Sequence, residues 1–241
     1  MKKNVYKRQL EFNDGHWWFE SRKEIIKFFL KKKLKKKNIE ILDFGCGVGI
    51  NFKMLSEFGT VYYYDQNKDI VNQNKKRFNS NNFKHINKLK KSTKKFDLIV
   101  ALDVIEHIED DKKIIKILSN KLKKNGKILI TVPAYNFLFS SKDIDLEHKR
   151  RYNMKSIVSI LRKYFIIEKK TYFNFFLAPL IAASIILLNF LSFKFIDKVE
   201  KKPNIIINLI FKKIFTFEKY LIGFMTLPFG ISIFIYGKKK N

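Results

Sequence analysis

Residues 41–49 read Ile41-Leu42-Asp43-Phe44-Gly45-Cys46-Gly47-Val48-Gly49. The apolar run from Ile39 to Phe44 predicts a short buried strand, and the glycines after it predict a sharp turn into a helix. Glycines at such a turn permit left-handed backbone torsions and let a ligand approach the main chain. The stretch therefore predicts an α/β fold with a cofactor bound where its first strand ends.

The spacing of these glycines discriminates between cofactors. A dinucleotide enzyme uses Gly-x-Gly-x-x-Gly and places the pyrophosphate at the helix N-terminus. Here the third glycine comes one residue early, and an acid, Asp43, precedes the first. An acidic side chain at this place repels a pyrophosphate but suits a sulfonium and an ammonium group. The pattern therefore favours S-adenosylmethionine over a dinucleotide, with Asp43 in the cofactor site.

A second acid, Asp65, directly follows the predicted strand 61–64 and lies 22 residues beyond Asp43. The two oxygens of a carboxylate can accept hydrogen bonds from both hydroxyls of a ribose. Taken singly, each acid could instead cap a helix or occupy a turn. Because both acids follow consecutive strands at this spacing, a cofactor site is the favoured interpretation.

Strands and helices alternate along most of the chain. We expect strands over residues 39–44, 61–64, 82–86, 96–102, 127–132, 165–172 and 230–236, and helices over residues 16–37, 50–58, 67–78, 110–124, 153–163 and 204–222. This alternation predicts a Rossmann-like, doubly wound and mostly parallel seven-stranded sheet. We divide the chain into an N-terminal helical lid (1–38), a cofactor-binding domain (39–172), an apolar helical insert (173–229), and the last strand with a basic tail (230–241).

Five further segments carry a family resemblance that runs nearly end to end. They are His16-Trp17-Trp18-Phe19 with Arg22, Ala101-Leu102-Asp103-Val104-Ile105-Glu106-His107, Val132-Pro133-Ala134-Tyr135, His148-Lys149-Arg150-Arg151-Tyr152 and Leu227-Pro228-Phe229-Gly230. Together with the glycine loop, they make the chain resemble a class I S-adenosylmethionine-dependent methyltransferase. The resemblance is to a bacterial subgroup related to the ubiquinone-biosynthesis O-methyltransferases.

The resemblance implies an enzyme and assigns the cofactor contacts. By it, the methionine part of S-adenosylmethionine lies on the glycine loop, the ribose on Asp65 and its neighbour Gln66, and the inner face on Leu102 and Asp103. The loop residues concerned are Gly45, Cys46, Gly47 and Gly49. The family usually places an acid after the third strand for the adenine amino group. This chain has Asn87 there instead, whose carbonyl is the acceptor that we expect.

Histidines and a basic segment are the candidates for the chemistry on the acceptor. Methyl transfer from a sulfonium is an in-line displacement, and a hydroxyl acceptor must also lose its proton, usually to histidine. We expect His148 to be the base, with His107 as a second candidate. Arg150 and Arg151 would clamp an acidic group on the acceptor. The alternatives are that His107 only starts a helix and that residues 147–152 form a solvated or salt-bridged corner.

Residues near the N-terminus complete the expected substrate site. Trp17 and Arg22, together with Tyr152, are the remaining candidate contacts to the acceptor. The aromatic residues 17–19 are either a lid that excludes water from the sulfonium or part of a helix that packs on the core.

The composition bears on partners and location. Lys and Arg number 50 against 22 Asp and Glu, and the resulting net charge of +28 fits either a solvated lysine coat or attraction to an anionic membrane. Nucleic acid is the least favoured partner, because residues 102–105 do not read Asp/Asn-Pro-Pro-Tyr and the single cysteine, Cys46, lies in the glycine loop. One cysteine and four scattered histidines indicate no disulfide and no metal site. The basic start, without an apolar run, predicts a cytoplasmic location.

Residues 173–193 form an uncharged apolar stretch of 21 residues, long enough to span a bilayer as a helix. Lysines flank both ends, and a return of residues 230–236 to the sheet requires both ends on one side, so a cytoplasmic-face location is favoured. Three interpretations stay open: a monotopic or re-entrant helical hairpin over residues 173–222, a structural subdomain or dimer interface, and a spanning segment. The first is favoured.

A membrane-surface insert suggests O-methylation of an amphiphilic or lipid-linked acceptor. The first alternative is a soluble methyltransferase for a small or sugar-derived acceptor, with the insert as a lid. The second is a cofactor-binding scaffold on the membrane surface that has lost its acceptor site.

Overall fold

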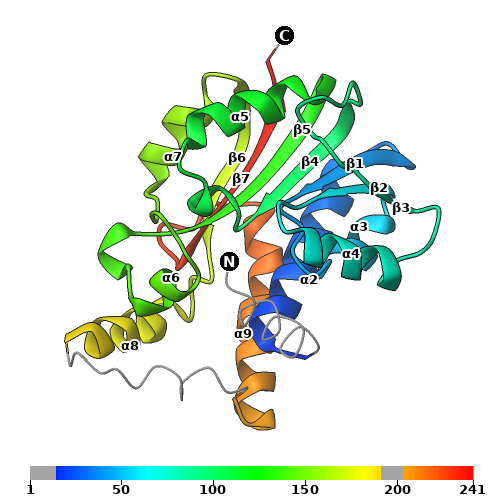
Figure 1. Cartoon of the computed structure of the whole chain (residues 1–241). Helices are drawn as coiled ribbons and strands as arrows, with labels where there is room; N and C mark the ends of the chain where they lie inside the picture. The colour runs from blue at the N-terminus through cyan, green and yellow to red at the C-terminus, as the bar shows by residue number, and fades with distance from the viewer. Residues whose placement is uncertain (1–14, 191–202, 241) are drawn as a thin grey trace.

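The computed structural model describes residues 15–190 and 203–240. Within them, seven strands form one sheet in the order β3-β2-β1-β4-β5-β7-β6 (Figure 1). The strands are β1 Ile39–Phe44, β2 Gly59–Tyr64, β3 Phe83–His85, β4 Phe96–Leu102, β5 Leu122–Pro133, β6 Phe165–Phe173 and β7 Ser232–Lys239. Strands β1 to β5 pair in parallel, whereas β7 runs antiparallel to both β5 and β6. The predicted Rossmann-like sheet is confirmed.

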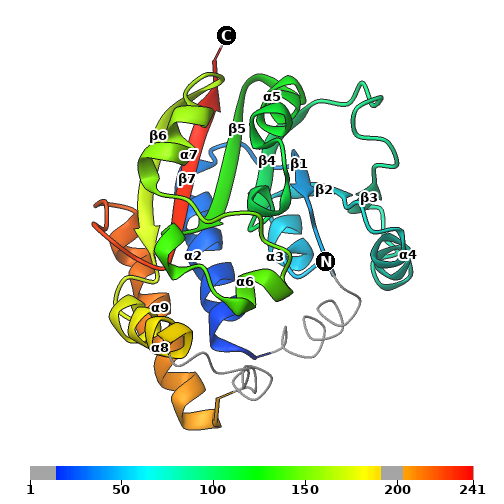
Figure 2. The ribbon, with the colours of Figure 1, turned by 60° about the vertical axis from the view of Figure 1, so that its left-hand side comes forward.

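Helices cover both faces of this sheet (Figures 1 and 2). They are α2 Trp17–Lys33, α3 Phe52–Ser56, α4 Lys68–Arg77, α5 Asp111–Asn120, α6 Ser141–Asp145, α7 Met154–Leu161, α8 Ala178–Phe190 and α9 Ile205–Ile222, with short 3-10 turns η1 Ile105–His107 and η2 Asn136–Leu138. Successive residues of β1 point to opposite faces of the sheet and belong to two hydrophobic cores. Ile41 packs with residues of α2, α3 and α9, and Leu42 packs with residues of α5 and α7.

The parallel strands bring their carboxyl ends to one edge of the sheet. Phe44 at the end of β1 pairs with Tyr64 at the end of β2, and Leu102 at the end of β4 pairs with Thr131 of β5. The strand order reverses between β1 and β4, which is the switch point where open α/β sheets bind ligands. The loops that carry most of the predicted site residues therefore open at this edge.

Helix α2 lies side by side with α9 in both ribbon views (Figures 1 and 2). The backbone N–H of Trp17 donates to Oδ1 of Asn208 at 2.9 Å, and Oγ of Ser21 donates to the carbonyl of Lys212 at 3.1 Å. Four apolar residues of α2, Ile25, Ile26, Phe29 and Leu30, are buried in the core. Within the described part of the predicted lid, residues 15–38, most residues thus belong to a helix that packs on the core.

The insert before β7 is helical, as expected, and its two helices pack on different neighbours. Helix α9 packs on α2, whereas α8 packs on η2. Glu218 of α9 joins them at the base, where its Oε1 accepts from the backbone N–H of Phe175 at 2.6 Å and of Phe176 at 3.2 Å. The end of the apolar stretch, residues 191–193, lies outside the described residues. Among the described helices, none is both long and apolar enough to cross a bilayer.

The boundary between α5 and β5 differs most from the expectation. The predicted helix 110–124 ends at Asn120, and β5 begins at Leu122. Leu122 is buried and pairs with Phe96, so its side chain contributes to the core of the sheet and does not continue the helix. Asn125 then takes a left-handed φ of 63°, and the register between β4 and β5 shifts before Lys127. Gly126 therefore lies inside an irregular strand and does not terminate a helix.

Candidate active site

A cavity of about 1320 Å³ opens at the carboxyl edge of the sheet. Its wall includes the glycine loop, the ends of β2 and β4, the first turn of α2, the segment from α6 to Arg151, and one side of α8 and of α9. Small-molecule sites usually occupy roughly 300–1,000 Å³. The cavity is therefore large enough for a cofactor together with an acceptor.

The glycine loop has the backbone that the sequence predicts. Gly45, Gly47 and Gly49 have φ values of 72°, 51° and 77°, in the left-handed region that favours glycine. A Cβ on Gly45 would come within 2.4 Å of a methyl carbon of Val104, so the loop and the segment after β4 touch at this point. Gly45 and Gly47 both line the cavity and, being glycines, present only backbone to it. This fits a cofactor held against the main chain.

Asp65 connects the glycine loop to the loop after β2. Its Oδ2 accepts from the backbone N–H of Gly47, and its Oδ1 accepts from that of Asn67, both at 2.9 Å. Each carboxylate oxygen has a second lone pair, so both can still accept a hydroxyl. Asp65 and Gln66 both line the cavity. The geometry fits the ribose contact that the resemblance implies.

Asp43 is the predicted cofactor residue with the most unusual environment. Its side chain is buried and lies outside the residues that line the cavity, and its Oδ2 has no hydrogen-bond partner. Burial and the nearby charge of Asp65 raise the pKa of Asp43 to about 7. Asp43 can therefore affect the site through its charge, but it does not contact the cavity in which the cofactor would lie.

The structure brings most of the other predicted cofactor residues together. Gly45, Cys46, Gly47, Leu102 and Asp103 line the cavity with Asp65 and Gln66, whereas Gly49 and Asn87 do not. Asn87 is exposed to solvent after β3 and is not among the residues that line the cavity. The expected adenine contact is therefore corrected: its place in the chain follows the family pattern, but its side chain is outside the cavity.

Arg22 lies at the floor of the cavity in a closed polar network. Its guanidinium forms an ion pair with Asp103 and donates to Oγ1 of Thr131 at 2.9 Å, and Thr131 in turn donates to Oδ1 of Asp103 at 2.8 Å. The rings of Trp18 and Phe173 lie 5.7 Å and 5.8 Å from the guanidinium carbon. Arg22 was expected to contact the acceptor. In the structure its guanidinium is instead paired with the Asp103 carboxylate.

Three further groups cluster where the ends of β4 and β5 face the cavity. Glu106, His107 and His148 have potential ligand atoms within 4.8 Å of one another, close enough to share one ligand or cation. The His107 and His148 rings meet edge to face at 4.6 Å between centroids. Glu106 is fully buried, and neither of its carboxylate oxygens has a hydrogen-bond partner. The sequence, with its scattered histidines, gave no sign of this proximity.

His148 is held by a buried acid that the sequence analysis missed. Its Nδ1 lies 2.8 Å from Oδ1 of Asp143, and the guanidinium of Arg151 donates to both oxygens of the same carboxylate at 2.9 and 2.8 Å. Arg151 and His148 hold the pKa of Asp143 well below its usual range, against the effect of burial. Ser140 and Asp143 also form a capping box, the one pattern from which this acid could have been located.

The two histidines have different surroundings. Burial, with a smaller effect from the neighbouring His148, lowers the pKa of His107 to about 4, so its ring is neutral near pH 7. Because the Asp143 carboxylate can only accept, Nδ1 of His148 carries the proton and Nε2 is left available.

The structure does not support most of the predicted anion clamp. Arg150 donates to Oδ2 of Asp111 at 3.1 Å and to the carbonyl of Glu109, and it does not line the cavity. The hydroxyl of Tyr152, a buried residue, donates to the same Asp111 oxygen at 3.0 Å. Arg151 does line the cavity, but its charge is paired with Asp143. The basic segment is thus mostly the salt-bridged corner that was the alternative interpretation.

The aromatic residues at the start of α2 pack on the core and also face the cavity, so they have features of both expected roles, the lid and the core helix. Trp17 is buried against Phe211 and Phe215 of α9, with ring centroids 5.4 and 6.0 Å away. Trp17, Trp18 and Phe19 also line the cavity. One end of a core helix therefore forms part of the cavity wall.

Comparisons with known proteins show the family of this chain. A family model described as "Methyltransferase domain" matches residues 15–169, more than half of the chain. The ubiquinone biosynthesis O-methyltransferase of Pelagibacter ubique is 34% identical over 129 residues, covering 48% of this chain and 54% of that protein. The histidine protein methyltransferase 1 homolog of Dictyostelium discoideum is 24% identical over 140 residues, covering 52% of this chain and 45% of that protein. The chain thus spans about half the length of these curated relatives.

Two solved structures share the fold at low sequence identity. The N-methyltransferase NodS from Bradyrhizobium japonicum, in complex with S-adenosylhomocysteine, has a TM-score of 0.54 at 14% identity and covers 70% of this chain and 88% of that chain. Phosphoethanolamine N-methyltransferase 2 from Haemonchus contortus, in complex with S-adenosylmethionine, has a TM-score of 0.57 at 19% identity and covers 90% and 52%. With the family model, the strand order and the glycine loop, they show that the chain belongs to the class I S-adenosylmethionine-dependent methyltransferases and that S-adenosylmethionine is its cofactor.

Proposed function

We propose that this methyltransferase methylates an oxygen of an amphiphilic or lipid-linked acceptor, bound at the cytoplasmic face of a membrane. The observation that carries the proposal is the His148–Asp143 pair, which shares one cavity with the glycine loop and Asp65. A base is needed when a hydroxyl is methylated, because its proton must leave as the new bond forms.

The residues of the cavity divide the work between binding and proton transfer. The bound cofactor supplies an electrophilic methyl group on a sulfonium. The glycine loop and Asp65 orient its methionine and ribose parts, which places the acceptor toward the opposite wall. There Asp143 and Arg151 fix the ring of His148, so that its Nε2 accepts the hydroxyl proton. The adjacent imidazole of His107, neutral near pH 7, does not repel the imidazolium that forms.

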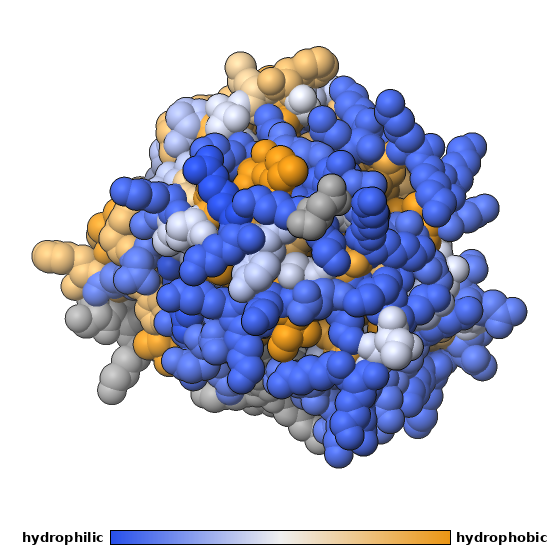
Figure 3. All heavy atoms as spheres, turned by 90° about the horizontal axis from the view of Figure 1, so that it is seen from above, coloured by the Kyte–Doolittle hydropathy of each residue, from blue (hydrophilic) through white to orange (hydrophobic). Residues whose placement is uncertain are grey.

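The surface around the cavity supports an apolar acceptor. Phe190 at the end of α8 is 84% exposed, and Ile205 and Ile206 at the start of α9 are 79% and 67% exposed. Both helices lie on the lower side of the molecule in Figure 1, and each also lines the cavity. The surface seen from above is mostly hydrophilic (Figure 3). Large exposed apolar groups gathered on one side are typical of protein or membrane contacts, and the positive net charge of the chain suits anionic headgroups.

A second candidate is a soluble enzyme for a small or sugar-derived acceptor. It is favoured by Ile181 and Ile185 of α8 and Phe211 of α9, which line the cavity as the parts of a lid would. Partition of the methylated product between organic solvent and water distinguishes the two. The non-catalytic scaffold predicts cofactor binding without any methylated product.

The test uses the full chain with tritiated S-adenosylmethionine and lipids extracted from bacterial membranes. We expect label in the organic phase, and a His148→Ala variant should lower the rate by roughly 10²–10⁴-fold while binding S-adenosylhomocysteine as the wild type does. His85→Ala removes a histidine outside the cavity and should leave the rate unchanged. Loss of S-adenosylhomocysteine binding in His148→Ala would place His148 in the cofactor site and contradict its role as base.

A further inference from the structure

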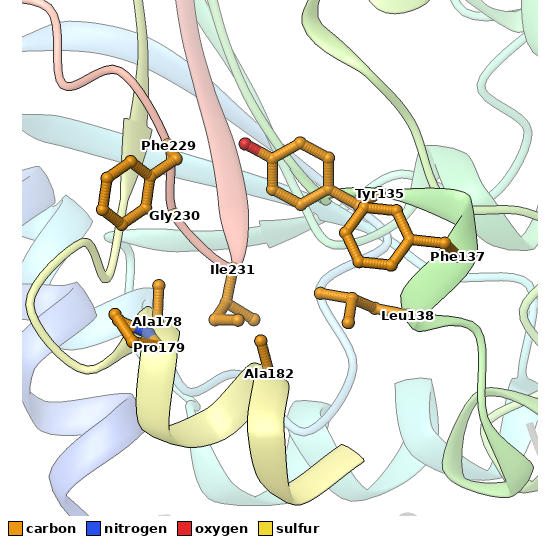
Figure 4. A pocket seen from close by; sticks show the side chains of 9 residues that line it. All are labelled: Tyr135, Phe137, Leu138, Ala178, Pro179, Ala182, Phe229, Gly230 and Ile231. Atoms are coloured by element: carbon orange, nitrogen blue, oxygen red, sulfur yellow. The ribbon is translucent and has the colours of Figure 1, made fainter. Parts of the chain in front are cut away.

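A second, smaller pocket of about 260 Å³ lies beside the cavity and has no part in the proposed mechanism. It is enclosed by η2 with its preceding residue, by the first turns of α8, and by the segment that enters β7 (Figure 4). Figure 4 shows Leu138, Ala182 and Ile231 converging on the space from these three elements. The pocket is thus built from the insert and the segment after β5, the two parts of the chain that surround the acceptor side of the cavity.

The pocket and the cavity share a thin wall. Ile231 lines both spaces. On α8, Ala178 and Ala182 line the pocket, and Ile181 and Ile185, one helical step away, line the cavity. Trp18, which lines the cavity, packs against the cluster of Leu138, Ala178 and Ile231. The residues that separate the cavity from the pocket, Ile231 and those of α8, are therefore apolar.

The lining accepts hydrocarbon and little else. The hydroxyl of Tyr135 is the one polar side-chain group among the residues that form it, and this hydroxyl already interacts with Tyr172 and the backbone of Gly230. A polar ligand would lose its hydrogen bonds to water without replacement. An apolar cavity of about 150 Å³ is large enough for benzene. The pocket at about 260 Å³ can therefore hold a longer segment of chain.

Aromatic side chains at the pocket remain exposed. Phe137 is 69% exposed and Phe229 is 40% exposed, on opposite sides of the opening (Figure 4). Removing apolar surface from water contributes about 25 cal/mol per Å². A hydrocarbon chain lying between the two rings would cover apolar surface of both that the pocket walls leave exposed to water.

We infer that this pocket binds the hydrocarbon chain of the methyl acceptor next to its head group. The inference rests on the proposed function, because it assumes that the acceptor head occupies the cavity. It narrows the acceptor to molecules whose apolar chain begins within a short distance of the methylated oxygen. A chain that bends directly from the head into the pocket fits the position of Ile231 on both walls.

The test is photo-cross-linking with dodecyl phosphate that carries a diazirine on the first few carbons of its chain, next to the phosphate. The wild type should be labelled on η2 and the first turns of α8, as located by mass spectrometry. Ala182→Phe fills the pocket and should reduce this label by at least about tenfold. Ala183→Phe adds the same ring to the exposed side of α8 and should keep the label. Equal S-adenosylhomocysteine binding by the three proteins shows that they are folded.

The outcomes separate this inference from the proposed function. Label confined to the exposed sides of α8 and α9, equal in both variants, would mean that the chain stays on the surface and would overturn the pocket. Methyl transfer to lipid would be untouched by that result. Conversely, pocket label lost in Ala182→Phe supports the inference, and an absence of methyl transfer to lipid would then count against the proposed function alone.

Discussion

Asp65 is the residue on which the cofactor half of the site depends. Its two oxygens fasten Gly47 and Asn67, so it shapes the glycine loop before any ligand is bound. A carboxylate that accepts two backbone N–H groups is a strong, charge-assisted partner. Loss of this side chain should therefore loosen the loop as well as remove the ribose contact.

Asp65→Ala should weaken S-adenosylhomocysteine binding by about tenfold or more, because a charge-assisted hydrogen bond contributes roughly 1.5–3 kcal/mol. Calorimetric titration measures it directly. Asp69→Ala, at an exposed acid on α4 of similar charge, is the matched control and should bind as the wild type does. Equal affinity in the Asp65 variant would remove this residue from the cofactor site.

The predicted residues that the structure places at the cavity are mostly those whose backbone position decides where they lie. Glycines with left-handed torsions and an acid at the end of a strand act where the chain puts them, so Gly45, Gly47 and Asp65 could be located from spacing. Asp143 is tied to Arg151 and His148, and the capping box with Ser140 locates it only as a residue at the start of a helix. The fold brings Glu106 beside His148, which the local pattern does not show.

Helices α8 and α9 are joined by an acid in an unfavourable environment. Glu218 is fully buried, its Oε2 has no hydrogen-bond partner, and Asn174 beside the junction is buried with both polar side-chain atoms unpartnered. Burial raises the pKa of Glu218 from 4.5 to about 7, although the backbone N–H groups of residues 174–176 partly oppose the rise. The base of the insert should therefore respond to pH.

Glu218→Gln should become more stable relative to the wild type as the pH rises. In the wild type the folded chain keeps the Glu218 proton up to about pH 7, whereas the unfolded chain releases it near 4.5. Stability is therefore lost between these two values and levels off above them, by roughly 3 kcal/mol in total. Urea unfolding at about pH 4, 6 and 8 measures the difference.

Glu24→Gln, at an exposed acid of α2, is the matched control. Its stability relative to the wild type should stay constant over the same pH range. If the Glu218 variant also shows a constant difference, the buried carboxyl titrates normally and the argument from its environment is wrong.

At the level of elements, periodicity and the glycine turns located the strands and most helices. The misplaced end of α5 shows the limit of that reasoning. Residues 121–125 are polar enough to extend a helix, and only the pairing of Leu122 with Phe96 ends it. Likewise, the apolar character of residues 173–222 predicted helices but not that α8 and α9 pack on different neighbours, because α8 presents apolar side chains nearly all round and therefore no single face to pack.

Exposed apolar residues are distributed unevenly over the molecule. The lower side in Figure 1 carries the exposed apolar residues of α8 and α9, and the side viewed in Figure 3 is largely hydrophilic. The lysine content could be counted from the sequence, but the segregation of apolar side chains to one side depends on how the insert folds back on α2 and η2.

A double variant, Ile205→Asp with Ile206→Asp, should reduce sedimentation with vesicles of phosphatidylglycerol and phosphatidylcholine by at least about tenfold, because it removes two apolar contacts and adds repelled charges. Acids in the first turn suit the helix dipole, so α9 should stay folded. The matched control is Ile166→Asp, at an exposed residue near the start of β6. Unchanged vesicle binding in the double variant would separate the insert from any membrane contact.

The place of β7 in the sheet has a consequence for biosynthesis. This strand follows the insert in the chain but lies between β5 and β6, and α9, just before it, completes the wall of the cavity beside α2. On the ribosome, β5 and β6 must wait for it with open hydrogen-bonding edges, and such pairings between distant segments form slowly. The wall that α9 and Ser232 contribute to the cavity should therefore form only as β7 inserts, and until then we expect the unpaired edges and the apolar insert to attract chaperones.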